Sequence, residues 1–225
     1  MKKLSDIMNM SLAMGGTLKA GCYKGLVKDI TKTVKNGKSY LDIKVKVKDV
    51  VYPWRIFDVN RFKLEYKLAT GEDLKKMKEL IGKDITFYAT VDGRFNRFSM
   101  LQFLPDVGSY EVTYGGVAVS EEYSAFAVKL IFDEEVTCYD IKMITSDEDL
   151  ARFVNYTMSS IAYQLGFNEE FTIAQLEDHV GEPLIVNIIK KAEYKSKFLN
   201  YDVITTVSLS EEDEIENLDE LDEEF

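Results

Sequence analysis

The sequence of 225 residues is poor in the side chains that build metal centres and covalent-catalysis sites. The separation of its two cysteines, Cys22 and Cys138, fits no metal or redox spacing, so we expect small buried side chains in a reducing compartment. The single histidine, His179, excludes most metal sites and leaves no spare for a histidine-based nucleophilic triad. Walker, HExxH, zinc-finger and GxSxG patterns are also absent. We therefore expect neither an enzyme nor a cofactor.

Long apolar runs are missing as well. No stretch approaches the roughly 18 apolar residues of a transmembrane helix. The first residues begin like a signal peptide, but Asp6 and Asn9 interrupt the apolar stretch, so we expect a cytoplasmic protein without a membrane partner. The chain is nevertheless 46% hydrophobic and 12% aromatic, which is enough to bury a core.

Charge is divided unevenly along the chain. Residues 1–104 hold 21 Lys and Arg against 11 Asp and Glu, whereas residues 105–210 hold 7 against 18. Residues 211–225 hold no basic residue and 10 acidic ones, and the whole chain has a net charge of −11. A basic first half attracts polyanions, while an acidic second half and tail repel them.

Both halves have the same order of predicted elements. Alternation of apolar and polar residues, with turn residues between, predicts three strands, a helix and a hairpin in each. In the first half the strands are expected over 20–33, 39–52, 54–59, 83–92 and 95–105, with a helix over 71–82. In the second half they are expected over 108–119, 122–132, 136–144, 183–194 and 197–207, with helices over 146–165 and 172–180.

This order resembles the oligonucleotide-binding (OB) fold, a small Greek-key barrel whose helix lies between strands three and four. The segments that begin at Ile81 and Val180 also align, which indicates a duplicated unit of about 100 residues. We predict a mostly β protein with few helices, built as two tandem OB-fold-like five-stranded barrels; a split-sheet α+β fold is the alternative. The expected divisions are an N-terminal extension (1–19), a basic barrel (20–107), an acidic barrel (108–208) and an acidic C-terminal tail (209–225) that is disordered.

Cations and aromatic residues are interleaved in the first half. Lys44, Lys46 and Lys48 alternate with apolar residues, so they point to one face of a strand. Single-stranded nucleic acid needs cations along its backbone and flat side chains on which bases stack. In the OB fold the binding face lies on strands two and three and the loops beside them. The candidate nucleic-acid-binding residues are Lys35, Lys38, Tyr40, Lys44, Lys46, Lys48, Trp54, Arg55, Phe57, Arg61, Arg94, Phe95 and Arg97. The alternative is that the lysines only solubilise this face and the aromatic residues belong to the core.

The C-terminal segment SEEDEIENLDELDEEF is dense in carboxylates and ends on Phe225. It resembles the acidic tails of bacterial and phage single-stranded DNA-binding proteins, although the proline and glycine residues familiar from bacterial tails are missing. The resemblance implies that Asp222, Glu223, Glu224 and Phe225 bind replication or recombination proteins, and that the tail competes with DNA for the basic face. A tail that merely solubilises the chain is the other interpretation.

These patterns together predict a single-stranded DNA-binding protein that acts in replication, recombination or repair in a bacterial or phage-infected cell. The acidic second barrel is expected to mediate self-association, as in a homo-oligomer, or partner contacts. One alternative is a protein-interaction module, either a replication accessory factor or an inhibitor that mimics DNA. Another is a metal-dependent nuclease, which would use carboxylates near the basic face such as Asp42, Asp58 or Asp92.

Overall fold

The computed structural model describes residues 17–35, 37–92, 95–133, 136–168, 170–190 and 197–202, and its strands form two five-stranded antiparallel sheets. The first sheet has the order β3-β2-β1-β4-β5. Its elements are β1 (Gly21–Lys35), β2 (Lys38–Val47), β3 (Val50–Ile56), helix α2 (Val59–Thr70), the 3₁₀ helix η1 (Met77–Leu80), β4 (Asp84–Asp92) and β5 (Phe95–Ser99). We call this unit the first barrel.

The second sheet has the order β10-β9-β6-β7-β8, which is the order of the first sheet with equivalent strands in equivalent places. Its elements are β6 (Gly108–Ser120), β7 (Ala125–Ile131), β8 (Thr137–Met143), helix α3 (Asp147–Arg152), the π-helical segment η2 (Phe153–Met158), α4 (Ser159–Gln164), α5 (Ile173–Glu177), β9 (Pro183–Lys190) and β10 (Lys197–Asn200). We call this unit the second barrel. The prediction of a mostly β chain with two tandem OB-like barrels is confirmed.

The first sheet curls because the long strand β1 pairs with two different strands along its length. Its first half pairs with β4 and its second half pairs with β2, with a bulge between Val27 and Asp29. The curl brings the edge strands together, and the rings of Trp54 on β3 and Phe98 on β5 lie 5.7 Å apart inside the barrel. Pro53 is tolerated within β3 because this strand pairs on one side only, with β2.

The two barrels repeat a local connection as well as a strand order. The Gly82 N–H donates to the Val27 carbonyl, and the Gly181 N–H donates to the Tyr114 carbonyl, each at 2.8 Å. Both glycines have positive φ, 84° and 103°, so each supplies a backbone conformation that other residues rarely adopt. These contacts join the turn before strand four to the middle of strand one in each barrel.

The helix of the first barrel is not where the sequence pattern places it. Residues 71–76 are not helical, and only Met77–Leu80 forms a short 3₁₀ helix, so the prediction of a helix over 71–82 is wrong. The helix is α2, which begins after Asp58, whose carboxylate accepts the Arg61 N–H at 2.9 Å. It ends at Gly71 with φ 76°. The expected third strand is also displaced: β3 starts at Val50 and ends at Ile56, and does not run over 54–59.

Helices in the second barrel agree better with the sequence. The expected helix over 146–165 is present as α3, η2 and α4 in succession, and the Ser146 side chain accepts the Asp149 N–H. The shorter helix, α5, covers less of the expected 172–180. In the described part of the chain, no helix has both the length and the apolar character to cross a membrane.

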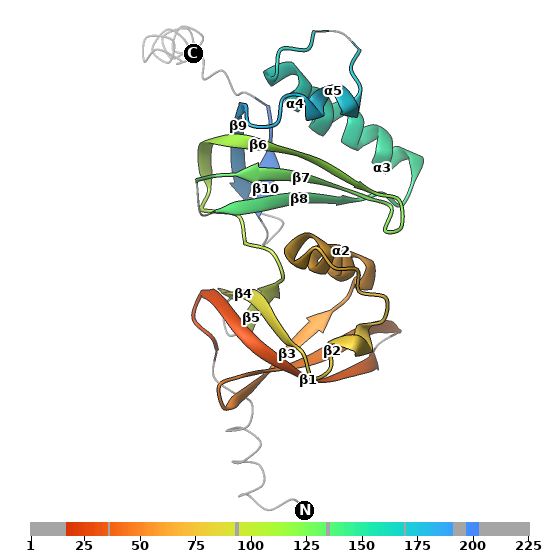
Figure 1. Ribbon diagram of the computed structural model, residues 1–225, viewed down its shortest axis with the longest axis vertical. Helices are drawn as coiled ribbons and strands as arrows, with labels where there is room; N and C mark the ends of the chain where they lie inside the picture. The colour runs from red at the N-terminus through yellow and green to blue at the C-terminus, as the bar shows by residue number, and fades with distance from the viewer. Residues whose placement is uncertain are drawn as a thin grey trace, which may run out of the picture.

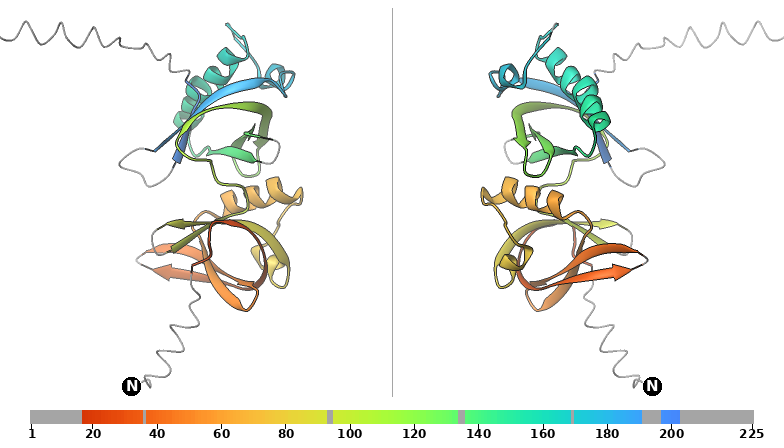
Figure 2. Two further views of the ribbon diagram at one scale, coloured as in Figure 1. Left: turned by 90° about the vertical axis from the view of Figure 1, so that its left-hand side faces the viewer. Right: turned by 90° about the vertical axis from the view of Figure 1, so that its right-hand side faces the viewer.

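Helix α2 lies between the two barrels (Figures 1 and 2). One of its faces contributes Phe62 and Tyr66 to the core of the first barrel. Its other face presents Leu64 and Leu68 to the outer face of β7 and β8, where they pack with Ala125, Ala127 and Ile141. The α3–α4 helices cover the opposite end of the second barrel, away from this contact (Figure 1). A single helix therefore closes one barrel and docks onto the other.

Candidate nucleic-acid interface

Strand β2 has one apolar face and one polar face, as its alternation predicts. Ile43, Val45 and Val47 are buried in the core of the first barrel. Lys44 and Lys46 point outward, on the face that also carries Tyr40 and Asp42. Because cross-strand neighbours share a face, the outer face continues onto β1 through Asp29 and onto β3 through Arg55.

The outward cations are paired with carboxylates. The Lys44 ammonium lies 3.3 Å from Asp29, Lys46 lies 3.6 Å from Asp49, and the Arg55 guanidinium lies 3.3 Å from Asp42. The hydrogen bond from Lys44 lowers the pKa of the Asp29 carboxyl. Such exposed pairs contribute little to stability, so phosphate oxygens are able to replace the carboxylates. The carboxylates nevertheless make this stripe less positive than the lysines alone suggest.

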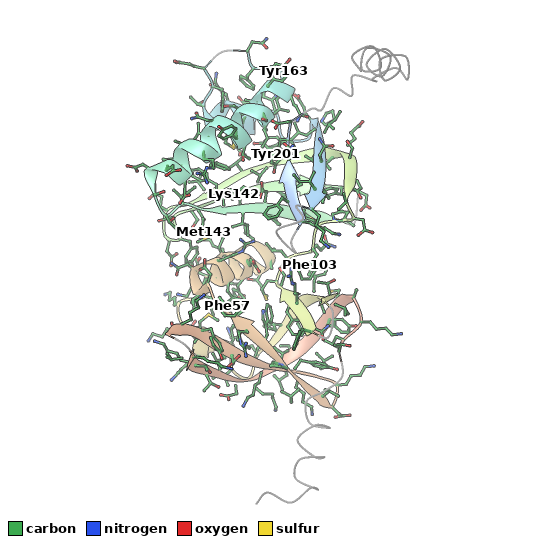
Figure 3. All side chains as sticks on the ribbon, turned by 180° about the vertical axis from the view of Figure 1, so that it is seen from behind. Phe57, Phe103, Lys142, Met143, Tyr163 and Tyr201 are labelled. Carbon is green, nitrogen blue, oxygen red and sulfur yellow. The ribbon has the colours of Figure 1, made fainter. Side chains whose placement is uncertain are left out.

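Phe57, Tyr40 and Arg55 form a cluster where β3 passes into α2. The Tyr40 and Phe57 ring centroids are 5.6 Å apart, and the Arg55 guanidinium carbon lies 4.4 Å from the centroid of the Tyr40 ring. Tyr40 is covered by these neighbours and is only 8% exposed, whereas Phe57 is 67% exposed. Phe57 lies on the outside of the barrel beside α2 (Figure 3). Of the two rings, Phe57 is therefore the one that offers its surface to a base.

Two lysines lie next to this cluster. Tyr40 on β2 is opposite Thr33 on β1. Two residues further toward the hairpin turn, on the same face, Lys38 is opposite Lys35. Both lysines are exposed. Gly37, in the hairpin turn between the strands, has φ 73°. Arg61, in the first turn of α2 and four residues after Phe57, adds a further cation and pairs with Glu65 at 3.2 Å. The structure thus gathers Lys35, Lys38, Tyr40, Arg55, Phe57 and Arg61 at one end of the outer face, which we call the hairpin site.

Trp54 does not belong to this surface. It is 4% exposed and its ring contacts Phe62, Phe87 and Phe98 inside the first barrel. Trp54 is therefore not a stacking platform but a core residue, as the alternative interpretation of the aromatic residues holds. Successive residues of a strand point to opposite faces, so the Trp54 ring lies inside the curled sheet and the neighbouring Arg55 faces outward.

The other candidates lie apart from the hairpin site or outside the described residues. Lys48 lies in the β2–β3 turn with φ 53°, about 30 Å from Lys38 at the usual rise of a strand. Phe95 and Arg97 lie on β5, and Phe95 is 76% exposed. Arg94 and the tail residues Asp222, Glu223, Glu224 and Phe225 are outside the described residues.

The carboxylates considered for a nuclease are occupied by structural contacts where they are described. Asp42 accepts hydrogen bonds from Thr33 and Arg55, and Asp58 caps α2. Over the described ranges, no group of three or more His, Cys, Asp and Glu side chains is arranged to hold a metal ion. His179 lies 2.9 Å from Glu182, next to α5.

The equivalent face of the second barrel is partly covered. The outer positions of β7 and β8 carry Ala125, Ala127 and Ile141, which pack against Leu64 of α2 and against Leu101. Sequence reasoning missed this contact, although the small residues of the AFAVKLI strand are the feature that permits close approach of a helix. The two barrels therefore differ in this face: in the first barrel it is polar and open, and in the second barrel the part at Ala125, Ala127 and Ile141 is apolar and packed against α2.

Comparisons with known proteins do not identify a family for this chain. No protein-family model matches the chain, and no curated protein matches it in sequence. Among solved structures, the chain resembles one described as "Crystal structure of the tetrameric p202 HIN2", with 9% identity over 84% of this chain and 94% of that chain and a TM-score of 0.23. A second, described as "Structural mimicry for functional antagonism", is 12% identical over 82% of this chain and 90% of that chain, with a TM-score of 0.24. At these scores the likenesses carry no inference, so the OB-like assignment rests on strand order and register.

Proposed function

We propose that the chain is a single-stranded DNA-binding protein that acts without catalysis, and that the first barrel holds the strand at the hairpin site. The observation that carries this proposal is the open outer face of β1–β3, where the exposed Phe57 ring lies among the cations of Lys35, Lys38, Arg55 and Arg61. An exposed aromatic ring beside backbone-binding cations is the combination that single strands require. It occurs on the strands that bind ligands in OB folds.

The charge distribution supports the choice of the first barrel. Residues 1–104 have a balance of +10, whereas residues 105–210 have a balance of −11. Helix α2 also covers part of the outer face of β7 and β8, which would otherwise be the matching surface of the second barrel. A polyanion is therefore attracted to the first barrel and finds its binding face open.

The acidic C-terminal residues complete the proposed function. A free carboxylate beside an apolar ring suits a small pocket with a basic edge on a partner protein. We infer that Asp222, Glu223, Glu224 and Phe225 recruit replication or recombination proteins to the bound strand; these residues lie outside the described ranges.

A protein-interaction module is the second candidate, and exposed aromatic residues on the second barrel favour it. Tyr156 on η2 and Tyr163 on α4 are both largely exposed. They lie on the helices farthest from the first barrel, where Figure 3 shows Tyr163. A polythymidine shift assay separates the two candidates, because an interaction module need not bind a single strand.

Substitution of Phe57 tests the hairpin site. In the full-length chain, Phe57→Ala is expected to weaken oligothymidine binding about ten-fold, since stacking on one base contributes about 1–3 kcal/mol. The thermal midpoint should barely change because the ring is largely exposed. Fluorescence anisotropy at several salt concentrations measures the affinity, and its log–log slope should be about −0.7 per phosphate contacted.

Phe95→Ala is the matched control, because it removes a similarly exposed ring from outside the hairpin site. Equal effects of the two substitutions would place the strand elsewhere on the barrel. Absence of oligothymidine binding by the unmodified protein would refute the function itself. The full-length chain is used because a fragment of the first barrel alone would expose Leu64 and Leu68.

A further inference from the structure

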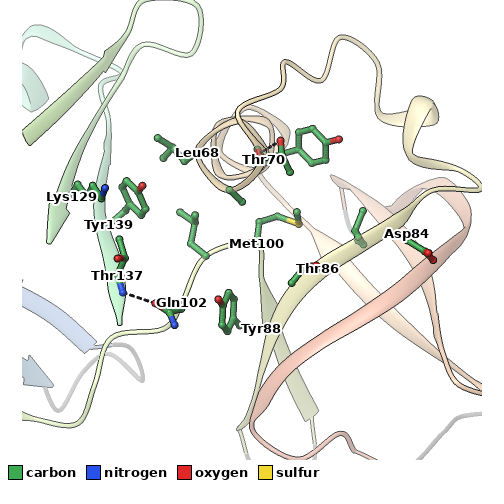
Figure 4. A pocket seen from close by; sticks show the side chains of 14 residues that line it. Leu68, Thr70, Asp84, Thr86, Tyr88, Met100, Gln102, Lys129, Thr137 and Tyr139 are labelled. Atoms are coloured by element: carbon green, nitrogen blue, oxygen red, sulfur yellow. Dashed lines mark hydrogen bonds between the residues drawn. The ribbon is translucent and has the colours of Figure 1, made fainter. Parts of the chain in front are cut away.

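A cleft of about 500 Å³ lies between the two barrels (Figure 4). Strand β4 and helix α2 of the first barrel form one wall, and β7 and β8 of the second barrel form the other. The connecting residues Met100–Gln102 lie between the walls. The cleft occupies the part of the β7–β8 outer face that α2 leaves uncovered.

Two tyrosines stand on opposite walls of the cleft. Tyr88 projects from β4 and Tyr139 from β8, and both are half-buried (Figure 4). The rest of the lining is rich in hydroxyl and amide groups, including Thr86, Thr137 and Gln102. Gln102 is held in place by the Thr137 N–H, which donates to its side-chain oxygen at 2.6 Å. A cleft with aromatic walls and polar groups suits a flat, polar ligand better than an apolar one.

Lys129 supplies a positive charge to the lining of the cleft, which also includes the Asp84 carboxylate. It is in register with Tyr139 across β7 and β8. Within the described ranges Lys129 has no ion pair, whereas Lys142, Arg152 and Lys197 of the same barrel are paired with Asp140, Glu148 and Asp106. Its stem lies over Gly115, where a Cβ would come within 2.7 Å of the Lys129 Cγ. Glycine at this position therefore lets the lysine stem lie close against β6.

The cleft is continuous with the outer face of the first barrel. Asp84, at one end of the cleft, is opposite Leu26 on β1, which is in turn opposite Lys46 on β2. Lys24 lies beside this path and its ammonium is 3.5 Å from Asp84. A strand that leaves the hairpin site along β2 can therefore reach the cleft across β1 without leaving the surface of the sheet.

We propose that the inter-barrel cleft binds one nucleotide of the single strand, with its base against the Tyr139 or Tyr88 ring and its phosphate at Lys129. The cleft volume lies within the range of sites for small ligands and accommodates one nucleotide. This inference rests on the proposed function and adds a second contact point, supplied jointly by the two barrels. It gives the acidic second barrel a direct part in holding the strand.

Oligothymidines of increasing length test the proposal with the full-length protein. Tyr139→Ala should weaken binding of long oligomers about ten-fold and leave short ones, which cover only the hairpin site, nearly unaffected. Lys129→Gln should reduce the salt slope for long oligomers by about 0.7, the value for one phosphate contact. Lys190→Gln is the matched control, because it removes the same charge from an exposed position of the second barrel away from the cleft. Oligomers that carry 5-iodouracil should cross-link to Tyr139 or Tyr88 on irradiation.

The outcomes separate the two proposals. If binding depends on Phe57 but is unchanged by Tyr139→Ala and Lys129→Gln, with no cross-link in the cleft, the nucleotide site is refuted while the proposed function stands. If the unmodified protein binds no oligothymidine, the proposed function fails first. Lys129 is not part of the apolar contact between the barrels, so Lys129→Gln is expected to leave the fold intact.

Discussion

Trp54 is part of an aromatic core, with its ring 5.3, 5.6 and 5.7 Å from those of Phe62, Phe87 and Phe98. We expect Trp54→Ala to reduce the free energy of unfolding by about 3–5 kcal/mol, the usual cost of deleting a buried large aromatic side chain. Urea denaturation monitored by circular dichroism measures this loss. Because Trp54 is the single tryptophan, its fluorescence should also stay constant on DNA binding. Strong quenching by oligothymidine would contradict the buried position.

Burial of Cys138 makes stability depend on alkaline pH. Its thiol donates to the Phe103 carbonyl at 3.5 Å, and burial raises its pKa from 9.0 to about 11. Since the folded-state pKa is raised, this stabilisation is complete below pH 9 and is lost as the pH rises toward 11. The loss amounts to about 3 kcal/mol, because each pKa unit corresponds to about 1.4 kcal/mol. Denaturation curves at successive pH values should show a shallower decline over this range for Cys138→Ala.

For single residues, the sequence predicts which face of a strand a side chain points to better than it predicts which side chains lie next to it. The strict alternation of β2 correctly separates Ile43 and Val45 from Lys44 and Lys46. It contains no information about Asp29 or Asp49, whose positions beside the lysines depend on strand register and turn geometry. The segment expected as a strand over 54–59 contains aromatic rings in both environments, since Trp54 is buried in β3 and Phe57, just after the end of β3, is exposed. No periodicity distinguishes a core ring from a surface ring in such a segment.

At the scale of elements, apolar periodicity does not predict helix α2 because this helix has two apolar faces. Phe62 and Tyr66 face the first barrel, whereas Leu64 and Leu68 face the second. The sequence of α2 therefore lacks the single apolar stripe that is typical of a surface helix. Residues 71–82 have such a stripe, but most of them are not helical in the structure. Its boundary residues were visible, namely Asp58 as the cap and Gly71 at the end. Capping residues were better evidence here than periodicity.

The double role of α2 predicts the effect of one substitution. Leu64→Ala should lower the free energy of unfolding by about 2–5 kcal/mol, because it leaves a cavity between the barrels. Leu150→Ala on α3 is the control, as this leucine is exposed and its truncation should cost far less. Thermal denaturation compares the two variants. Equal midpoints would mean that the contact between the barrels contributes little to stability.

At the scale of the whole molecule, the opposite charges of the two ends predict competition. Ten carboxylates in residues 211–225 belong to the same chain as a basic face, so their effective concentration at that face is high. Deletion of residues 211–225 should therefore tighten DNA binding, most of all at low salt, where screening is weakest. Titration of the full-length and shortened proteins with oligothymidine at low and high salt measures the difference.

Phe225→Ala separates the two proposed roles of the tail. It should reduce binding to a replication protein such as a polymerase or helicase while DNA affinity hardly changes, because the carboxylates are retained. If the deletion alters neither DNA affinity nor partner binding, solubility is the only role left for the tail.

The duplicated architecture was predictable because strand order follows from patterns within each half. The arrangement of one barrel on the other was not, because it depends on Ala125 and Ala127 meeting a helix more than fifty residues earlier in the chain. For the same reason, no pattern in the sequence predicts the inter-barrel cleft. Its lining comes from four separate strands and helices and from the connection between the barrels.

The connection between the barrels is firmly held. Leu101 is buried, Gln102 accepts the Thr137 N–H, and the Lys197 ammonium donates to the Leu104 and Pro105 carbonyls and pairs with Asp106. Many proteins with two modules on a loose linker cover variable lengths of a strand, since the modules engage independently. Here the spacing between the hairpin site and the cleft is set by packing rather than by a tether. The protein, bound to a single strand as proposed, would therefore cover a constant number of nucleotides, and neighbouring copies along the strand would be evenly spaced.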